Sequence, residues 1–597
     1  MREVKGLAES SNTLSLAARQ GILTTGTVTI NPLIKPYLAV FPMPNGPVTG
    51  DTAKYNFAAA LNGVEQYALS KFDHNFTERT ILSGSFQFDD TVLDAPDAYN
   101  QKRIGSPSRH YNTVLNLQHA FSPTVLNSAR IGLSRTVAFD SQDTTALNPV
   151  ATDTALAFLP GRNPGIITVP GTTGTQGGIG ASGADQFHYT SIQAGDDASV
   201  IRAKHTVRFE ATVERLRDNI NSVATPLGEW DFDSIPDFLT GIPGQYIADI
   251  PGTNDIRGLR TTYVGAYVQD EFALRPNLKL NAGLRYEYLS PLTEAFGRVA
   301  VLRTLDAVTP TLGGSYFNNP TKRNFAPRVG IAWDPIGTGK MSVRAGYGIY
   351  DILLLPYLVV NRTNGAPFFQ SGQIVSPPPI SFPNAANALI NTTGLRASYI
   401  QPNPPRAYNQ QWNLTIQRQI TGNTVVTLGY VGAHAVHIPQ GVDDLDLVPP
   451  SFLTIAPDGH LAFPIFKGAL PRINPNWGRI PSTLWDDVSS YNGMVLDFSK
   501  RLSHGLFFGG AYTYSKNIDL GSTTFSSNES SNASENPYPF IASLNRGPSD
   551  YDVRHNAVIN FTWTLPTPGS FAGVSKEMLA GWQLGGSSPL IQDRRSR

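Results

Sequence analysis

Hydrophobic and polar residues alternate along the segment 262–289, TTYVGAYVQDEFALRPNLKLNAGLRYEY. In its second half, Leu278 and Leu284 fall on one side of an extended chain, and Lys279 and Arg285 fall on the other. Side chains of a β-strand point alternately to its two faces. The segment therefore predicts two strands joined by a short turn, with one apolar face and one charged face.

The same two-strand unit recurs along most of the chain. Its strands have roughly the 9–11 residues that a tilted strand needs to cross a bilayer. The other predicted strands are 67–74, 80–88, 111–121, 125–135, 188–201, 205–216, 328–334, 341–350, 411–420, 424–432, 491–502, 506–516 and 555–565, with a last one starting near 579. The alternation thus predicts about 15–16 strands.

The connections between these strands fall into two classes of length that alternate. Short connections, such as 122–124 and 421–423, contain Pro, Gly or Asn, which favour tight turns. Long connections, such as 136–187 and 217–260, lack periodicity, and we expect them to be exposed polar loops. Short turns at one end and long loops at the other are typical of outer-membrane barrels.

No segment is long and apolar enough for a transmembrane helix. The most apolar run, ILLLPYLVV at 352–360, is well short of the roughly 20 residues that a helix needs. Only helices and closed barrels satisfy every backbone group in hydrocarbon. The pattern predicts an all-β fold, a large antiparallel transmembrane β-barrel with long extracellular loops and short periplasmic turns. A large soluble β protein, such as a propeller, is the alternative, but its repeat would be regular.

The cost of placing charge in lipid assigns the two faces of this barrel. A Lys or Arg on the lipid face near the midplane costs about 2–4 kcal/mol. Charged residues within the strands should therefore line the lumen. The predicted lumen-facing residues are Arg208, Glu210, Lys279, Arg285, Glu287, Arg328 and Arg344.

Composition narrows the classes of function. Lys plus Arg and Asp plus Glu both total 46 of 597 residues, so no overall basic charge favours a nucleic-acid partner. The chain has no Cys, which excludes disulfides, thiolate metal sites and cysteine nucleophiles. The motifs GxSxG and HExxH and a phosphate-binding loop are also absent from the sequence. These observations favour a protein that is not an enzyme and needs no cofactor or metal.

Two polar clusters in the long loops are candidate ligand contacts. Clustered carboxylates suit hard cations, although the first cluster lacks the glycine and terminal glutamate of a calcium loop, which favours a solvated loop. The second cluster joins an aromatic ring to two carboxylates and could contact a polar ligand. The candidate residues are Asp231, Asp233 and Asp237 in the first cluster, and Trp485, Asp486 and Asp487 in the second.

Several segments, taken in order, resemble one family of barrels. They are YVQDEFALRPNLKLNAGLRYE, NFAPRVGIAWDP, VRAGYGIYD, QWNLTIQRQI, VVTLGYVGAHAVHI, SKRLSHGLFFGGAYTYSKNID, RGPSDYDVRHNAVINF and GWQLGG. The chain resembles TonB-dependent outer-membrane receptors, in particular the Oar-like branch of acidobacteria. The resemblance covers nearly all of 20–586.

The resemblance implies a barrel of 22 strands that encloses an N-terminal plug. It also implies uptake of a scarce ligand, such as an iron chelate, a glycan or a peptide, driven by the TonB–ExbB–ExbD complex acting through the plug. Outer-membrane lipid and the barrel-assembly machinery are further implied partners. A signal peptide, plug and TonB box are not found ahead of residue 1, and the basic end RRSR departs from the family's aromatic ending.

These departures lead us to expect a fragment that contains about 15–16 of the 22 strands. The expected organisation is an irregular lead-in with short strands at 1–60, a transmembrane barrel region at 61–586 and an atypical tail at 587–597. The predicted function is the barrel portion of a TonB-dependent receptor in the bacterial outer membrane. A passive porin-like or surface-binding barrel, and a secreted soluble β-sheet binding protein, are the two alternatives.

Overall fold

The structure is a computed structural model. It describes residues 2–181, 185–222, 225–250, 252–319, 321–354, 356–385, 389, 395–464, 471–503, 505–522, 538–566 and 581–591. Most of these residues belong to one large, mainly antiparallel sheet of 22 strands, which confirms the predicted all-β fold class. The expected number of about 15–16 strands was too low, because β1 and several short strands also join the sheet. None of the helices among them is long and apolar enough to cross a membrane.

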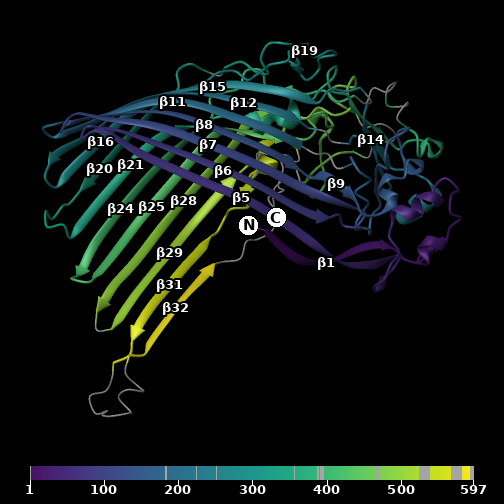
Figure 1. Ribbon diagram of the computed structural model, residues 1–597, viewed down its shortest axis with the longest axis horizontal. Helices are drawn as coiled ribbons and strands as arrows, with labels where there is room; N and C mark the ends of the chain where they lie inside the picture. Colours follow the sequence, from purple (N-terminus) through teal and green to yellow (C-terminus); the bar gives the residue numbers. More distant parts are fainter. Residues whose placement is uncertain are drawn as a thin grey trace.

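The large sheet is built from long strands that follow one another in a curved wall (Figure 1). They are β1 (Arg2–Leu14), β5 (Thr52–Thr77), β6 (Thr80–Pro96), β7 (Lys102–Ser122), β8 (Val125–Asp140), β11 (Asp185–Arg202), β12 (His205–Asn221), β15 (Ile256–Arg275), β16 (Leu278–Leu289), β20 (Phe325–Trp333), β21 (Met341–Asp351), β24 (Tyr408–Thr421), β25 (Thr424–Val442), β28 (Ser482–Ser503), β29 (Leu506–Asp519), β31 (His555–Thr564) and β32 (Gln583–Ile591). Short strands extend the same sheet: β4 (Val48–Thr49), β9 (Gln142–Ala146), β17 (Thr293–Glu294), β23 (Tyr399–Ile400) and β30 (Gly547–Pro548).

Consecutive long strands pair antiparallel, as hairpins do. The ladder runs from β1 to β5 and then in sequence order to β32. The predicted short turns are shorter still, because the strands extend into them. β15 and β16, for example, are separated only by Pro276 and Asn277.

Two of the predicted boundaries differ from the structure. Residues 1–60, expected to form an irregular lead-in, contribute β1 and the first part of β5 to the wall, with Leu14 opposite Thr52. The strand β1 contains few large apolar side chains, so apolar and polar residues hardly alternate along it. Its pairing with β5 is nevertheless possible, because the hydrogen bonds between strands are made by backbone groups. The tail expected at 587–597 begins inside β32, where Ser587 pairs with Asn560; residues 592–597 lie outside the described part.

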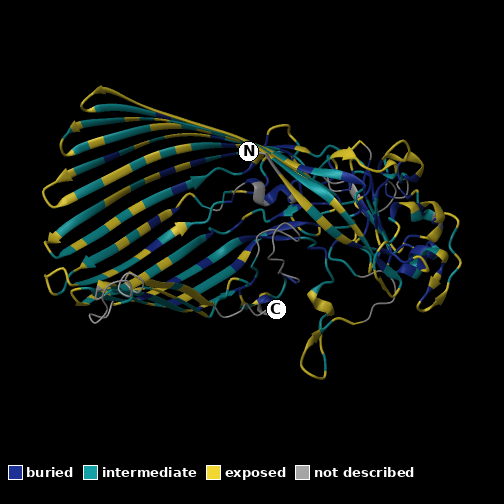
Figure 2. Cartoon of the chain, turned by 60° about the horizontal axis from the view of Figure 1, so that its bottom comes forward, coloured by how far each residue is buried: buried dark blue, intermediate teal, exposed yellow. Residues whose placement is uncertain are grey.

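The long loops gather at one end of the wall and pack into a cap. Figure 2 shows buried residues concentrated at this end, and bands of exposed and half-buried residues along the strands. The cap contains a four-stranded sheet of β10 (Ile166–Thr168), β13 (Glu229–Asp231), β14 (Gln245–Asp249) and β22 (Ser371–Val375). Its strand pairs are β2 (Ile22–Leu23) with β3 (Gly26–Thr27), β18 (Ala300–Val301) with β19 (Thr311–Leu312), and β26 (Thr454–Ile455) with β27 (Leu461–Ala462).

Short helices complete the loop regions. The α-helices are α1 (Ile235–Thr240) and α3 (Ala542–Asn545). The 3₁₀ helices are η1 (Ala18–Gln20), η2 (Lys35–Val40), η3 (Pro149–Thr152), η4 (Thr154–Leu156), η5 (Pro356–Arg362), η6 (Pro379–Ser381) and η7 (Pro450–Phe452).

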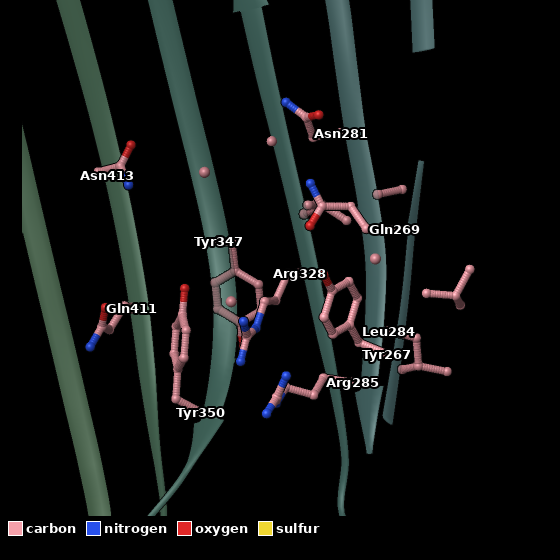
Figure 3. A pocket seen from close by; sticks show the side chains of 17 residues that line it. Tyr267, Gln269, Asn281, Leu284, Arg285, Arg328, Tyr347, Tyr350, Gln411 and Asn413 are labelled. Atoms are coloured by element: carbon pink, nitrogen blue, oxygen red, sulfur yellow. The ribbon is translucent and has the colours of Figure 1, made fainter. Parts of the chain in front are cut away.

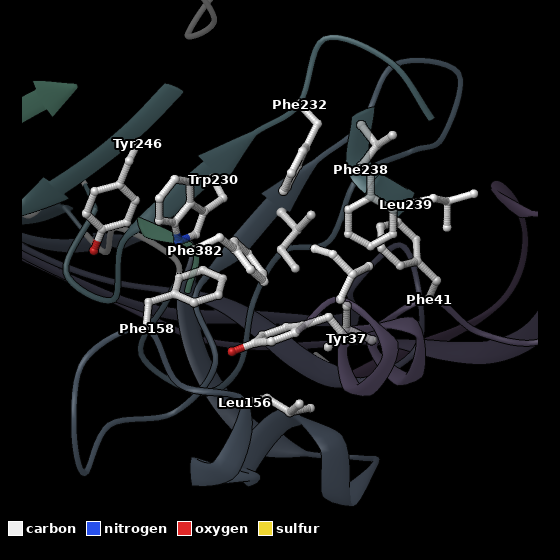
Figure 4. Packing of buried hydrophobic residues seen from close by; sticks show 14 of the residues in the cluster. Tyr37, Phe41, Leu156, Phe158, Trp230, Phe232, Phe238, Leu239, Tyr246 and Phe382 are labelled. Carbon is white, nitrogen blue, oxygen red and sulfur yellow. The ribbon is translucent and has the colours of Figure 1, made fainter. Parts of the chain in front are cut away.

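The largest hydrophobic cluster joins residues from loops far apart in sequence (Figure 4). Trp230 lies 4.4 Å from Tyr246 and 5.3 Å from Phe382 between ring centres, and the Tyr37 ring is 4.9 Å from Phe382. Burying such rings is a large hydrophobic gain. The long connections are therefore not simply exposed polar loops as expected. Scattered aromatic residues carry no periodicity, so their packing is not visible in the sequence.

Candidate functional site

The register of the wall places the charged residues on one face, here called the polar face. Residues directly opposite each other on adjacent strands lie on the same face. Arg208 is opposite Gln269, Gln269 is opposite Gly283, and Gly283 is opposite Arg328. The same pairing rule links Lys279 through the β20 strand to Arg344. Alternation along β12 and β16 puts the remaining predicted residues, Glu210, Arg285 and Glu287, on this face too.

The other face, here called the apolar face, exposes large hydrophobic side chains along the wall. They include Ile131, Val213, Val268, Leu284, Val329 and Leu414. The described part of the cap packs on the polar face. Along β15, Leu259 is buried in a cap cluster and stands on the same face as Tyr263 and Tyr267.

A hollow of about 260 Å³ lies on the polar face across β15, β16, β20, β21 and β24. Gly283, Gly330, Gly346 and Gly348 form its floor, so the backbone is uncovered there. The side chains around this floor are Tyr267, Gln269, Asn281, Arg285, Arg328, Tyr350, Gln411 and Asn413 (Figure 3). Amides, rings and guanidinium groups thus surround a surface that a ligand can approach closely.

The glycines in the floor are needed for its shape. A β-carbon on Gly348 would stand 3.1 Å from the Tyr350 hydroxyl and 3.2 Å from Cγ of Arg328. A β-carbon on Gly283 would stand 3.2 Å from the Val268 carbonyl oxygen. Both approaches are tighter than ordinary van der Waals contact, so larger residues would displace the side chains that border the hollow.

The two arginines of the hollow have different partners. Arg285 Nε lies 3.0 Å from Oε1 of Glu287, and its Nη2 donates to the Tyr263 hydroxyl at 2.8 Å. Tyr263 in turn donates to Glu287 at 2.7 Å. Arg328 instead stacks on Tyr350, with Cζ 4.3 Å from the ring centre, and its buried Nε has no hydrogen-bond partner among the described residues. Arg285 is therefore held in place by its neighbours, whereas Arg328 keeps a donor available for a ligand.

The cap packs on the same face as the hollow, farther along β15 at Leu259. Its second hydrophobic cluster includes Trp485 of β28 and Phe317, whose ring centres are 5.4 Å apart. Residues 359–364, here called the crossing segment, tie several wall strands together at this end. Nε of Arg257 in β15 donates to the Thr363 carbonyl oxygen at 3.0 Å, and Nε of Arg362 donates to the carbonyl oxygen of Ser482, in β28, at 3.2 Å. Asn364 Nδ2 donates to the Ser222 carbonyl oxygen, just after β12, at 3.1 Å.

The first cluster of loop candidates mainly serves local structure. The Asp237 backbone N–H donates to Ser234 Oγ at 3.2 Å, so Ser234 caps the helix α1. Asp231 accepts a hydrogen bond from the Gln245 side chain, and Asp233 is exposed. Within the described ranges, no three His, Cys, Asp or Glu side chains gather in a way that could hold a metal ion.

The second cluster of loop candidates is divided between the surface and the interior. Trp485 is buried in the cap and Asp486 is exposed. Asp487 lies in β28, is buried, and accepts from the backbone N–H groups of Val488 and Leu520.

Sequence reasoning named the arginines of the hollow but missed its aromatic and amide residues. These residues come from three strands, and only the register brings them together: Tyr267 and Gln269 from β15, Tyr350 from β21, and Gln411 and Asn413 from β24. The glycines at polar-face positions of neighbouring strands are the signal in the sequence that could have located the hollow.

Comparison with known proteins identifies the family. The family model described as "Outer membrane beta barrel domain" matches residues 9–590. The chain belongs to this family. Membership agrees with the apolar face of the wall and indicates an outer-membrane location. No curated protein matches the chain.

One solved structure shares the fold of this barrel with a TM-score above 0.5, and two others match with lower scores. The outer membrane transporter YddB from Escherichia coli aligns with 99% of the chain and 73% of its own length, at 11% identity and a TM-score of 0.52. The alcaligin outer membrane receptor FauA from Bordetella pertussis aligns with 92% of the chain and 65% of its own length, at 12% identity and a TM-score of 0.44. The copper transporter OprC aligns with 91% of the chain and 61% of its own length, at 9% identity and a TM-score of 0.49.

Proposed function

We propose that the chain is the barrel region of a TonB-dependent receptor that takes up a small ligand across the bacterial outer membrane. The observation that carries the proposal is a polar hollow, with an available cation, on one face of a wall whose opposite face exposes apolar side chains. A transport barrel requires this division, because lipid meets one face and the ligand path meets the other.

The polar face then lines the lumen, with Arg208, Glu210, Lys279, Arg285, Glu287, Arg328 and Arg344 along it. Support comes from the cap, which packs on this face and would screen a ligand path from outside. Asp233 and Asp486, the two exposed loop candidates, would meet the ligand before the hollow does. The ligand itself is an iron chelate, a glycan or a peptide in this proposal.

Energy for uptake would come from the TonB–ExbB–ExbD complex through a plug domain. The barrel-assembly machinery would insert the wall in the membrane. In this arrangement the barrel region corresponds to 61–586, extended by β1 and the start of β5. A passive porin-like barrel is the competing function, and it needs no energy source.

Uptake with and without TonB tests the proposal. Cells producing the full gene product would be given iron-loaded ferrichrome, a labelled acidic oligosaccharide or a labelled tetrapeptide. We expect accumulation of at least one probe, and only in cells that have TonB. Equal accumulation in both strains would favour the passive barrel, and accumulation of none of the three would contradict ligand uptake.

A further inference from the structure

A row of residues crosses six strands of the polar face. Arg208, Gln269, Gly283, Arg328, Gly348 and Gln411 stand opposite one another in turn. Arg208 and Arg328 are three strands apart, which places them about 14 Å from each other at the usual strand spacing. The hollow lies along this row, between and beyond the two arginines.

The charges near this row are not balanced. Arg285 is paired with Glu287 at 3.0 Å, and Lys279 with Glu271 at 2.8 Å. Neither Arg208 nor Arg328 has a carboxylate partner among the described residues. Arg328 is half-buried and Arg208 is exposed. A half-buried guanidinium that lacks a counter-ion favours the binding of an anion, and an exposed one adds positive charge nearby.

The neutral residues of the hollow are also unpaired. Gln269, Asn281, Gln411 and Asn413 make no side-chain hydrogen bond to any residue in the described part of the chain. Each amide can both donate to and accept from a hydroxyl group. The rings of Tyr267 and Tyr350 stand beside these amides and offer flat surfaces to a ligand (Figure 3).

We propose that this row binds an acidic oligosaccharide, with sugar carboxylates on Arg328 and Arg208. Arg328 presents a planar fork that matches a carboxylate, and its stacking on Tyr350 fixes the plane of that fork. The amides then bond the sugar hydroxyls, and the uncovered glycine floor lets a sugar ring lie close to the backbone. The inference rests on the proposed function, because it names the class of ligand that the barrel would take up.

Titration of detergent-purified protein tests the site without a membrane or TonB. The probes are tetragalacturonate, which is acidic, maltotetraose, which is neutral, and citrate, which carries carboxylates but no sugar ring. The variants are Arg328→Gln and Arg208→Gln. Arg79→Gln, in the turn between β5 and β6, is the matched control because it removes the same charge outside the hollow.

We expect tetragalacturonate to bind more tightly than either other probe. Arg328→Gln should weaken it by about tenfold or more, Arg208→Gln by less, and Arg79→Gln should leave it unchanged. Arg328→Lys should recover only part of the affinity, because an ammonium group lacks the planar fork. Circular dichroism and heat-modifiable gel mobility establish that each variant is folded.

Two outcomes would overturn the inference. If the folded Arg328→Gln variant binds tetragalacturonate as tightly as the natural protein does, Arg328 is not part of the binding site. If maltotetraose or citrate binds as tightly as tetragalacturonate does, the site does not select an acidic oligosaccharide. Loss of energised uptake in cells would leave these results unchanged, so failure of the proposed function is distinguishable from failure of this site.

Discussion

The guanidinium carbon of Arg328 lies 4.3 Å from the centre of the Tyr350 ring, over which it is stacked. The two residues come from adjacent strands, β20 and β21, and Gly348 leaves the space in which they meet. A stacked arginine keeps its charge and its outward-facing donors while its orientation is restricted. The stacking thus prepares an anion site before any ligand arrives.

Tyr350 should therefore contribute to affinity through its ring alone. Tyr350→Phe keeps the ring, and we expect the affinity for tetragalacturonate to stay within about twofold. Tyr350→Ala removes the stacking, which is worth about 0.5–1 kcal/mol at an exposed site, and should weaken binding by about two- to fivefold. Titration of the three proteins measures both effects. Equal affinities of Tyr350→Ala and the natural protein would show that the stacking does not prepare the site.

Trp485 should hold the cap on the polar face. Trp485 is 5% exposed and its ring packs against Phe317. Replacement of a buried large side chain by alanine costs about 3–5 kcal/mol. Trp485→Ala should therefore speed hydrogen exchange in the crossing segment while the wall strands remain protected. Leu312→Ala is the control, because Leu312 is 55% exposed. It should change hydrogen exchange neither in the crossing segment nor in the wall strands.

Gly441 should be necessary for the crossing segment to stay in place. A β-carbon on Gly441, in β25, would overlap the guanidinium of Arg362. Gly441→Val should expel Arg362 and break its bond to Ser482, which loosens the end of the wall. We expect a larger ion conductance in planar bilayers than for the natural protein. Gly422→Val is the control, because Gly422 has open space around it. Equal conductance of both variants would show that the bond between Arg362 and Ser482 does not hold this end of the wall together.

The stability of the cap should fall as pH rises. Burial, followed by the nearby charge of Asp231, raises the pKa of Glu229 from 4.5 to about 7. The folded cap thus binds the proton of Glu229 more tightly than the unfolded loop does. The contribution of this proton to the stability of the cap is therefore fully present below pH 4.5 and is lost as the pH rises to about 7.

Hydrogen exchange in β13 and β14, corrected for intrinsic rates, measures this dependence at the two ends of that interval. Glu229→Gln imitates the protonated acid and should flatten the profile. Asp458→Asn, which changes an exposed turn carboxylate, should leave it intact. An unchanged profile in Glu229→Gln would assign the dependence to another group.

The sequence predicted the wall well because alternation is a direct signal of a two-faced strand. Strand β16 shows this most clearly: Lys279 and Arg285 alternate with Leu280 and Leu284, and the structure sets them on opposite faces. The strand β1 was missed because its pairing with β5 is made by backbone hydrogen bonds, which do not depend on the pattern of side chains.

The cap and the hollow were not predicted for a different reason. Trp230, Tyr246 and Phe382 meet across gaps of many residues, and no local pattern encodes such packing. The hollow depends on the register of five strands, which places Gln411 on the far side of Gly348 from Arg328. Register between distant hairpins is fixed by the whole wall, so single segments do not reveal it.

The central claim is that the apolar face meets lipid and the polar face meets water. The chain contains no Cys, so single substitutions to Cys report each face without background. In outer membranes, Val329→Cys and Leu414→Cys should react with a lipid-soluble maleimide and resist a charged one. Gly330→Cys and Asn413→Cys, on the other face, should react with the charged reagent. The same reactivity at Val329→Cys and Gly330→Cys, which are adjacent in β20, would contradict the claim.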